Sequence, residues 1–246
     1  MYIRSHLLIL FFAFCLSLSA QESAFNAGVR LGGGYSVNNH VDKILVSENY
    51  YSDYSFDDAL NIVFKQPVKT LLDVGGNTGR FALRTVEYNP DVQVTIMDLP
   101  QQLGLMKANT AGKAGAERIA GHPANLLDAS VPFPKGFDAI WMSQFLDCFS
   151  EDEVTSILSR AAAAMDEHTS LYILEAYWDR QQHETGAYCL TQISVYFTAM
   201  ANGNSKMYYS GDMIRCVERA GLEVSAIYDN LGSGNSHTLF QVKKKK

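Results

Sequence analysis

The fold of this chain is decided by residues 71–80, LLDVGGNTGR. The apolar residues predict a buried strand that ends near the carboxylate of Asp73, and the glycines predict a tight turn that opens a helix. A second predicted strand, residues 92–98, also ends at a carboxylate, Asp98. Two neighbouring acidic strand ends beside a glycine-rich turn indicate a Rossmann-like sheet that binds an adenosine at its carboxyl edge.

The loop decides which adenosine compound is expected. A dinucleotide fingerprint has the pattern G-x-G-x-x-G, but counting from Gly75 places Asn77 and Arg80 at its third and sixth positions. Asp73 beside the loop would repel a diphosphate and would favour a cationic ligand. S-adenosylmethionine (SAM) carries a sulfonium and an ammonium and has no phosphate, so it fits both observations.

The loop D-V-G-G-N-T-G resembles motif I of class I SAM-dependent methyltransferases. More narrowly, it is similar to the D-V-G-G-G-T-G of plant-type and bacterial small-molecule O-methyltransferases, the caffeate and hydroxyneurosporene type. Asn77 replaces the middle glycine of that family. Because Asn tolerates a left-handed backbone, we expect the loop to close as it does in the family. An ordinary strand-turn-helix with glycines for packing is the alternative.

The resemblance extends over about residues 68–242. Residues 98–100 match the family motif D-L-P, whose Asp holds the ribose and whose Leu packs on the adenine, and residues 137–140 match its aDAI. It implies that the cofactor contacts are Asp73, Gly75, Gly76, Asn77, Gly79, Asp98 and Leu99. Asn125 and Asp128 follow the third strand, where the family has an adenine contact, and either could instead be a turn residue. Ser143 stands where the family often has Lys.

The pattern along the chain predicts an α/β fold: a Rossmann-like, mostly parallel seven-stranded sheet with helices on both faces and an antiparallel last strand. After residues 71–80, strands are expected at 92–98, 118–122, 137–142, 171–175, 222–228 and 237–242. Helices are expected at 81–88, 101–113, 183–200 and 212–220, and from the capping box of residues 150–153 to residue 164.

The candidate base is Asp147, which an ungapped count from the aDAI motif places where the family has its catalytic His. A carboxylate with its ordinary pKa of about 4 is a weak base unless burial raises that value. Glu175 matches the family carboxylate that orients the His. His183 is either a substrate contact or structural, and His237 is expected to pack in the core. The alternative for Asp147 is a loop carboxylate.

Two sets of residues that are rich in aromatic side chains could each lie either at the ligand site or in the packed interior. Residues 48–56 are rich in Tyr and Phe, and they could close over SAM and an aromatic acceptor or form a cap on the sheet. Tyr188, Tyr196 and Met200 are spaced to share one helix face, which we expect to face the core rather than a pocket.

Composition limits the partners. The chain has 246 residues, 47% of them hydrophobic, and a net charge of −6, which disfavours a nucleic acid as substrate. The four cysteines lack metal-ligand or C-x-x-C spacing, so we expect reduced thiols and no metal site. The expected partner is a small-molecule acceptor. The family dimerises through an N-terminal helical domain that also roofs the substrate pocket, and that domain is expected to be missing here.

Residues 1–20 have the composition of a secretory signal peptide: Arg4 precedes an apolar run, and small residues follow it. Residues 21–45 form an N-terminal segment, and residues 46–246 form the methyltransferase domain. Because SAM is made and kept in the cytoplasm, we expect a cytoplasmic site of action. A true leader, an uncleaved anchor and a misassigned start remain open.

The predicted function is transfer of a methyl group from SAM to the hydroxyl of a small aromatic or polyketide-like acceptor. SAM-dependent N- or C-methylation is an alternative, because the catalytic His is missing. An exported, non-enzymatic protein with a Rossmann-like core is the alternative of a different class.

Overall fold

The computed structural model describes residues 53–200 and 204–245, and of residues 196–200 only the backbone. The predicted leader (1–20), the N-terminal segment (21–45) and residues 48–52 lie outside these ranges. The side chains of Tyr196 and Met200 are also not described. Among the helices of the described ranges, none is both long and apolar enough to cross a membrane.

The described residues form a seven-stranded sheet in the order β3-β2-β1-β4-β5-β7-β6. The first five strands are parallel, and β7 runs antiparallel to both β5 and β6. The strands are β1 (Thr70–Val74), β2 (Gln93–Asp98), β3 (Ile119–Pro123), β4 (Ala139–Ser143), β5 (Ser170–Glu175), β6 (Leu222–Leu231) and β7 (His237–Lys244). The predicted fold class is confirmed.

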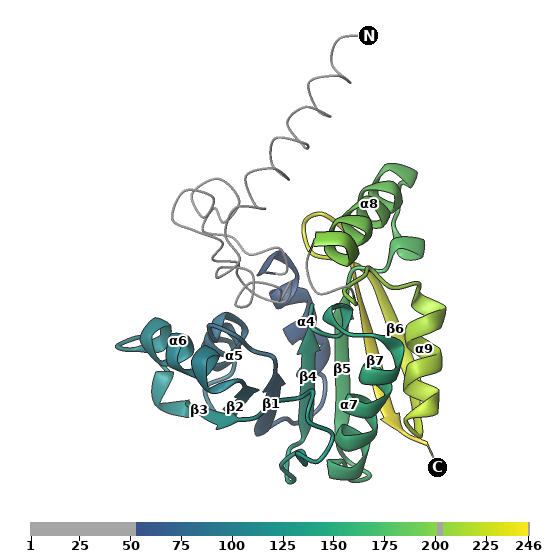
Figure 1. Cartoon of the computed structure of the whole chain (residues 1–246). Coiled ribbons are helices and arrows are strands. Elements are labelled where there is room, and N and C mark those ends of the chain that lie inside the picture. Colours follow the sequence, from purple (N-terminus) through teal and green to yellow (C-terminus); the bar gives the residue numbers. More distant parts are fainter. Residues whose placement is uncertain (1–52, 201–203, 246) are drawn as a thin grey trace.

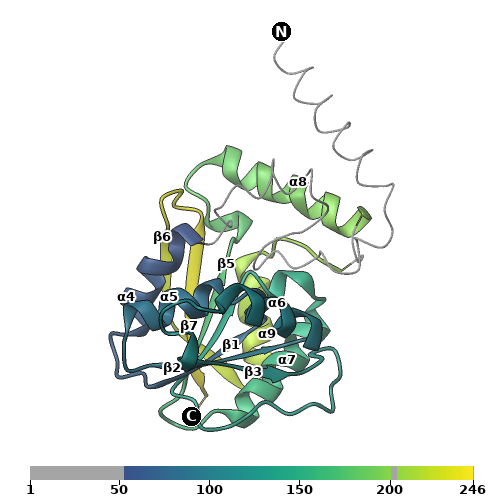
Figure 2. The same cartoon turned by 90° about the vertical axis from the view of Figure 1, so that its left-hand side faces the viewer.

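Helices cover both faces of the sheet (Figures 1 and 2). One face packs against α4 (Phe56–Val63), α5 (Arg80–Tyr88) and α6 (Pro100–Thr110). The other face packs against α7 (Glu151–Ala164) and α9 (Ser210–Arg219). Since successive strand residues point to opposite faces, Leu71 joins the first core and Leu72 the second. Both faces of β1 are therefore apolar, as the sequence predicts.

The carboxyl ends of β1 and β4 form the switch point of the sheet. From β1 the chain crosses through α5 to β2 on one side, and β4 lies on the other side of β1. Connections that leave in opposite directions open a crevice at the ends of such strands, which is where ligands bind in open α/β sheets. The acidic residues Asp73 and Asp98 lie at this edge.

Most predicted helices occur within one or two residues of their expected bounds. The capping box of α7 is present, with the Ser150 hydroxyl accepting from the Glu153 N–H and the Glu153 carboxylate accepting from the Ser150 N–H. The helix expected at 101–113 ends instead at Thr110. Ala111 leaves the helical conformation and Gly112 has a φ of +72°, which ends the helix earlier than the apolar pattern does.

Helix α8 (Glu184–Met200) lies beyond the carboxyl edge of the sheet (Figure 1). The expectation that Tyr188 faces the core is wrong, because its side chain is 65% exposed. The apolar spacing of this helix is real, but the neighbours needed to bury this face are not among the described residues. Short 3₁₀ turns at Asp53–Ser55 (η1), Leu146–Cys148 (η3) and Trp178–Arg180 (η4) complete the carboxyl edge.

Candidate active site

The glycine-rich loop adopts the closed conformation that was predicted. Gly75 and Gly79 have φ values of +72° and +77°, a region that L side chains rarely adopt. Asn77 has a φ of +48° and so holds the left-handed conformation in place of the family glycine. Its N–H donates to Asp98 Oδ2 at 3.0 Å, which ties the loop of β1 to the end of β2.

Gly76 allows Asp73 to lie directly beneath the loop. A Cβ at position 76 would lie 2.5 Å from Asp73 Oδ2, so any larger residue there would force Asp73 or the loop to shift. Asp73 is 2% exposed, and burial, with the nearby charge of Asp98, raises its pKa to about 8. The carboxyl group is therefore costly to ionise until a cation lies beside it.

A small cavity of about 20 Å³ lies next to the loop, between η1, α5 and the end of β4. Its lining includes four buried polar atoms that have no hydrogen-bond partner in the described part of the chain. They are Asp53 Oδ1, Asp73 Oδ2, Trp141 Nε1 and Ser143 Oγ. Buried polar atoms without partners are uncommon and need an explanation. Two carboxylate oxygens, one indole N–H and one hydroxyl match the ammonium and carboxylate of an amino acid.

Arg80 also lines this cavity, and it forms an ion pair with Asp53. It supplies a cation close to Ser143, the position at which the family often has Lys. Phe56 also lines the cavity, and its ring packs on Phe81, which stacks on Trp141. With a volume of about 20 Å³, the cavity holds little more than one water molecule.

The residues Asp53, Arg80 and Trp141 were not predicted as cofactor contacts. The sequence did carry one signal, since Asp53 and Phe56 belong to the aromatic stretch expected to close over the ligand or to cap the sheet. These two residues line the cavity and also contact α5, and their closing over a ligand stays a prediction.

The other predicted cofactor residues lie at the end of β2 (Asp98 and Leu99) and in the chain after β3 (Asn125 and Asp128). Asp98 is buried, and its Oδ1 accepts from the N–H of half-buried Leu99 at 2.6 Å. Asn125 and Asp128 are exposed, and each caps a turn: Asn125 accepts from the Leu127 N–H, and Asp128 accepts from the N–H and hydroxyl of Ser130. Neither lines the cavity at the loop, and their role toward adenine stays a prediction.

Glu175 is held rigidly at the end of β5. It is buried, and its Oε1 accepts from the N–H groups of Phe145 and Leu146 at 3.0 and 2.9 Å. The turn that presents these N–H groups begins at Gln144, whose φ is +46°. A non-glycine residue in this region stores backbone strain, which is common at functional sites. Burial and the charge of Asp147 raise the pKa of Glu175.

Asp147 lies in η3, on the same turn, and is 2% exposed. Neither of its carboxyl oxygens has a hydrogen-bond partner of good geometry among the described residues. Burial raises its pKa to about 7, although the Cys148 thiol and the turn's backbone N–H favour the ionised form. Two buried acids, Asp147 and Glu175, therefore share this edge of the sheet, and their titrations are linked.

The two histidines behave differently. His183 is exposed and lines a separate groove of about 450 Å³ between the start of α8 and the turn before β7, away from the loop cavity. His237 is buried, as expected, with its Nδ1 3.0 Å from the Ser55 hydroxyl. Burial lowers the pKa of His237 to about 4, so it packs as a neutral residue.

No disulfide joins the described cysteines: Cys148 and Cys216 are buried and Cys189 is exposed. In the described part of the chain, no group of three or more His, Cys, Asp or Glu side chains could hold a metal ion.

The sheet order, the glycine loop and the acidic ends of β1 and β2 define the class of Rossmann-like SAM-dependent methyltransferases. Within this class, the chain belongs to the O-methyltransferase domain family, whose sequence profile matches residues 39–221. The chain is 23% identical over 180 residues to O-methyltransferase SfmM3 of Streptomyces lavendulae, covering 72% of this chain and 53% of that protein.

A second relative is demethylspheroidene O-methyltransferase of Cereibacter sphaeroides, which is 30% identical over 151 residues, covering 60% of this chain and 38% of that protein. The chain thus spans between about a third and a half of the length of these relatives. Among solved structures, the SAM-dependent methyltransferase SibL has the same fold, with a TM-score of 0.71 and 20% identity, covering 86% of this chain and 61% of the other.

Proposed function

We propose that this protein transfers a methyl group from SAM to the hydroxyl of a small aromatic or polyketide-like acceptor. The observation that supports it most is that two features lie at the same edge of the sheet. One is the closed glycine loop between the acidic ends of β1 and β2, and the other is the buried acid Asp147, whose pKa is raised to about 7. Family membership supports the reaction type.

The cofactor would be held by the loop and by the unpartnered polar atoms of the cavity. Asp98 has lone pairs for the ribose hydroxyls, since each of its oxygens can accept more than one hydrogen bond. Asp53 and Asp73 would accept from the ammonium, and Trp141 and Ser143 would donate to the carboxylate. SAM supplies an activated methyl group on a sulfonium, so alignment and proton removal are left to the protein.

Asp147 is the proposed base. A general base works best when its pKa lies near the working pH, and burial brings this carboxyl close to that value. It would accept the proton of the acceptor hydroxyl as the oxygen attacks the methyl carbon. Glu175 holds the N–H groups of the turn and keeps Asp147 near the ends of β4 and β5, so its proposed role is to orient the base.

The cofactor assignment is tested by calorimetric titration of SAM into the wild-type chain and into Asp98→Ala. Loss of charge-assisted hydrogen bonds to two hydroxyls should weaken binding by about 100-fold or more. Asp91→Ala, at an exposed residue before β2, is the control and should leave affinity unchanged. Equal affinity of Asp98→Ala and wild type would remove Asp98 from the cofactor site, and absence of SAM binding to the wild type would favour a non-enzymatic protein.

The base assignment is tested with isotopically labelled SAM, a panel of phenols and aromatic amines, and mass detection of products. Asp147→Asn should slow phenol methylation by about 100-fold or more and abolish the acid limb of the pH profile near pH 7. An unchanged rate and profile would exclude Asp147 as base. Labelling confined to nitrogen or carbon would replace the O-methyltransferase proposal by the alternative, because a neutral amine needs no base before attack.

We propose a cytoplasmic site of action, on the chemical ground that the methyl donor is cytoplasmic. The leader-like composition of residues 1–20 is the opposing argument. Fractionation of the expressing cells, with mass determination of the protein's N-terminus, decides between them. A homodimer is a second proposal. It rests on the family resemblance, although the helical domain through which the family dimerises is expected to be missing here, and light scattering of the purified chain tests it.

A further inference from the structure

The turn that carries Asp147 is held by one short segment of the chain, residues 205–208, which connects α8 to α9. Three consecutive carbonyls of the turn each accept a hydrogen bond from this segment. The bonds join Lys206 N to Asp147 O (2.9 Å), Ser205 Oγ to Cys148 O (3.5 Å) and Tyr208 Oη to Phe149 O (2.5 Å). Since Ser205 and Tyr208 are buried, water cannot easily replace a bond that is lost.

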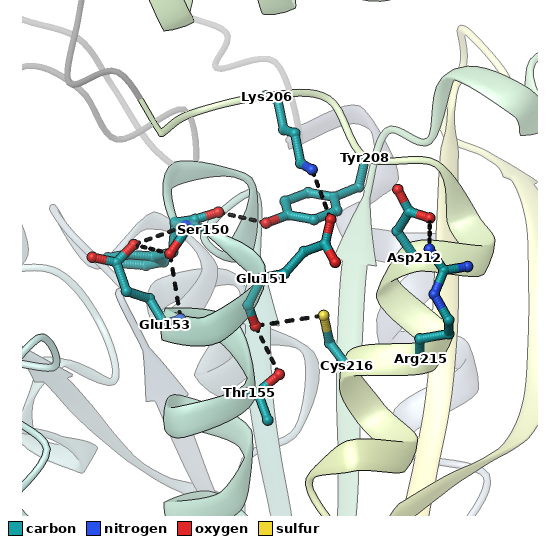
Figure 3. Close-up of polar contacts among 10 residues, drawn as sticks. Ser150, Glu151, Glu153, Thr155, Lys206, Tyr208, Asp212, Arg215 and Cys216 are labelled. Carbon is teal, nitrogen blue, oxygen red and sulfur yellow. Dashed lines mark hydrogen bonds and ion pairs between the residues drawn. The ribbon is translucent and has the colours of Figure 1, made fainter.

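The segment is itself anchored on both sides. The Lys206 ammonium pairs with Glu151 at the start of α7, at 3.0 Å, and lies 4.6 Å from the centre of the Tyr208 ring (Figure 3). The Met207 N–H donates to the Ser194 hydroxyl of α8 at 2.8 Å. Residues 205–208 therefore connect α7, α8 and the Asp147 turn at one point.

The Asp147 side chain is supported from within its own turn rather than by a distant element. The donors that favour its ionised form are the neighbouring Cys148 thiol and a backbone N–H of the turn, so the backbone of the turn sets where the carboxyl lies. Glu175 fixes the first part of that turn, through the N–H groups of Phe145 and Leu146. The second part, from Asp147 to Phe149, is fixed by residues 205–208.

We propose that residues 205–208, and the Tyr208 hydroxyl in particular, position Asp147 by keeping its turn closed and its carboxyl buried. This inference rests on the proposed role of Asp147 as base. It assigns Tyr208 as a positioning residue, since its hydroxyl bonds to a backbone carbonyl two residues beyond Asp147 and acts on the acceptor only through it. Tyr208→Phe removes this single bond and retains the buried ring.

The test measures the titration of Asp147 itself and needs no acceptor. The full chain is labelled with carboxyl-¹³C aspartate, and the Asp147 signal is identified by its loss in Asp147→Asn. In the wild type the midpoint should lie at about pH 7. In Tyr208→Phe the midpoint should fall by about one unit or more toward the ordinary Asp value, because an opened turn admits water to the carboxyl. Tyr209→Phe, at a half-exposed ring beside Trp178, is the matched control and should titrate as the wild type does.

Two failures are distinguishable in this experiment. A midpoint near pH 7 in both the wild type and a folded Tyr208→Phe overturns the positioning role and leaves the proposed base intact. A wild-type midpoint near 4 overturns the base, and the positioning role with it. If Tyr208→Phe does not fold, Ser205→Ala takes its place, because it removes the longest of the three hydrogen bonds. A fall of the Asp147 midpoint that is smaller than one unit then supports the proposal, and an unchanged midpoint overturns the proposal.

Discussion

Replacement of Asp73 by Asn should stabilise the protein while it weakens cofactor binding. Asp73 is buried beneath Gly76, one of its oxygens has no partner in the described part of the chain, and burial together with Asp98 raises its pKa to about 8. Asn has nearly the same size and carries no charge. The substitution therefore removes the cost of burying an ionised group without opening a cavity.

The sign and size of the effect follow from proton linkage. Because the folded-state pKa of Asp73 lies above its unfolded value of 3.8, the folded protein binds more protons than the unfolded chain between about pH 4 and pH 8. This contribution lowers stability as the pH rises through that window. Between pH 5 and pH 8 about three pKa units are crossed, which bounds the effect at about 4 kcal/mol. Water entry and loop relaxation reduce it, and we expect about 2 kcal/mol.

The assay is urea unfolding of the wild type and Asp73→Asn, each at pH 5 and pH 8 without SAM. The free energy of unfolding of Asp73→Asn, relative to that of the wild type, should be about 2 kcal/mol higher at pH 8 than at pH 5. Asp91→Asn, at an exposed site, should show no such difference. SAM affinity of Asp73→Asn at pH 8 should fall by about tenfold or more. The same relative stability at both pH values would refute the reasoning.

Three further changes test the packing around the site. Gly76→Ala places a Cβ 2.5 Å from Asp73 Oδ2, so we expect the free energy of unfolding in urea to fall by about 1–3 kcal/mol. We also expect no SAM binding that calorimetry can measure. Gly104→Ala is the control: a Cβ there would meet no atom within 4 Å, and this variant should bind SAM normally. Ser150→Ala removes the capping box of α7 and should cost about 1 kcal/mol of unfolding free energy, and no loss would mean that the box adds little to stability. Leu158→Ala, at a fully buried position of the same helix, should cost about 2–5 kcal/mol in the same assay, and a cost below 1 kcal/mol would contradict the packing described.

The sequence predicted the features that depend on neighbours along the chain. The strand-loop-helix of residues 71–80, the capping box of residues 150–153 and the left-handed Asn77 are set by local sterics and local hydrogen bonds. The alternation of strands and helices follows from the apolar periodicity. The helix expected at 101–113 ends earlier, at Thr110, because Gly112 adopts a left-handed conformation that stops it although the apolar pattern continues.

Other features needed the tertiary structure. The exposed face of α8 at Tyr188 could not be predicted, because periodicity shows that a face is apolar but not what covers it. The cavity that joins Asp53 to Asp73, Trp141 and Ser143 combines three separate parts of the chain, and of these residues only Asp73 matched a motif.

The sequence alone places Asp73 and Asp98 at the carboxyl edge of the sheet, since each stands at or next to the end of its strand. Their protonation is decided only by the tertiary structure. The raised pKa values of Asp73 and Asp147 arise from burial by helices and turns distant in sequence, and the turn at Asp147 is closed by residues about 60 positions further on. Desolvation depends on every atom that displaces water around a group, and no local pattern encodes that.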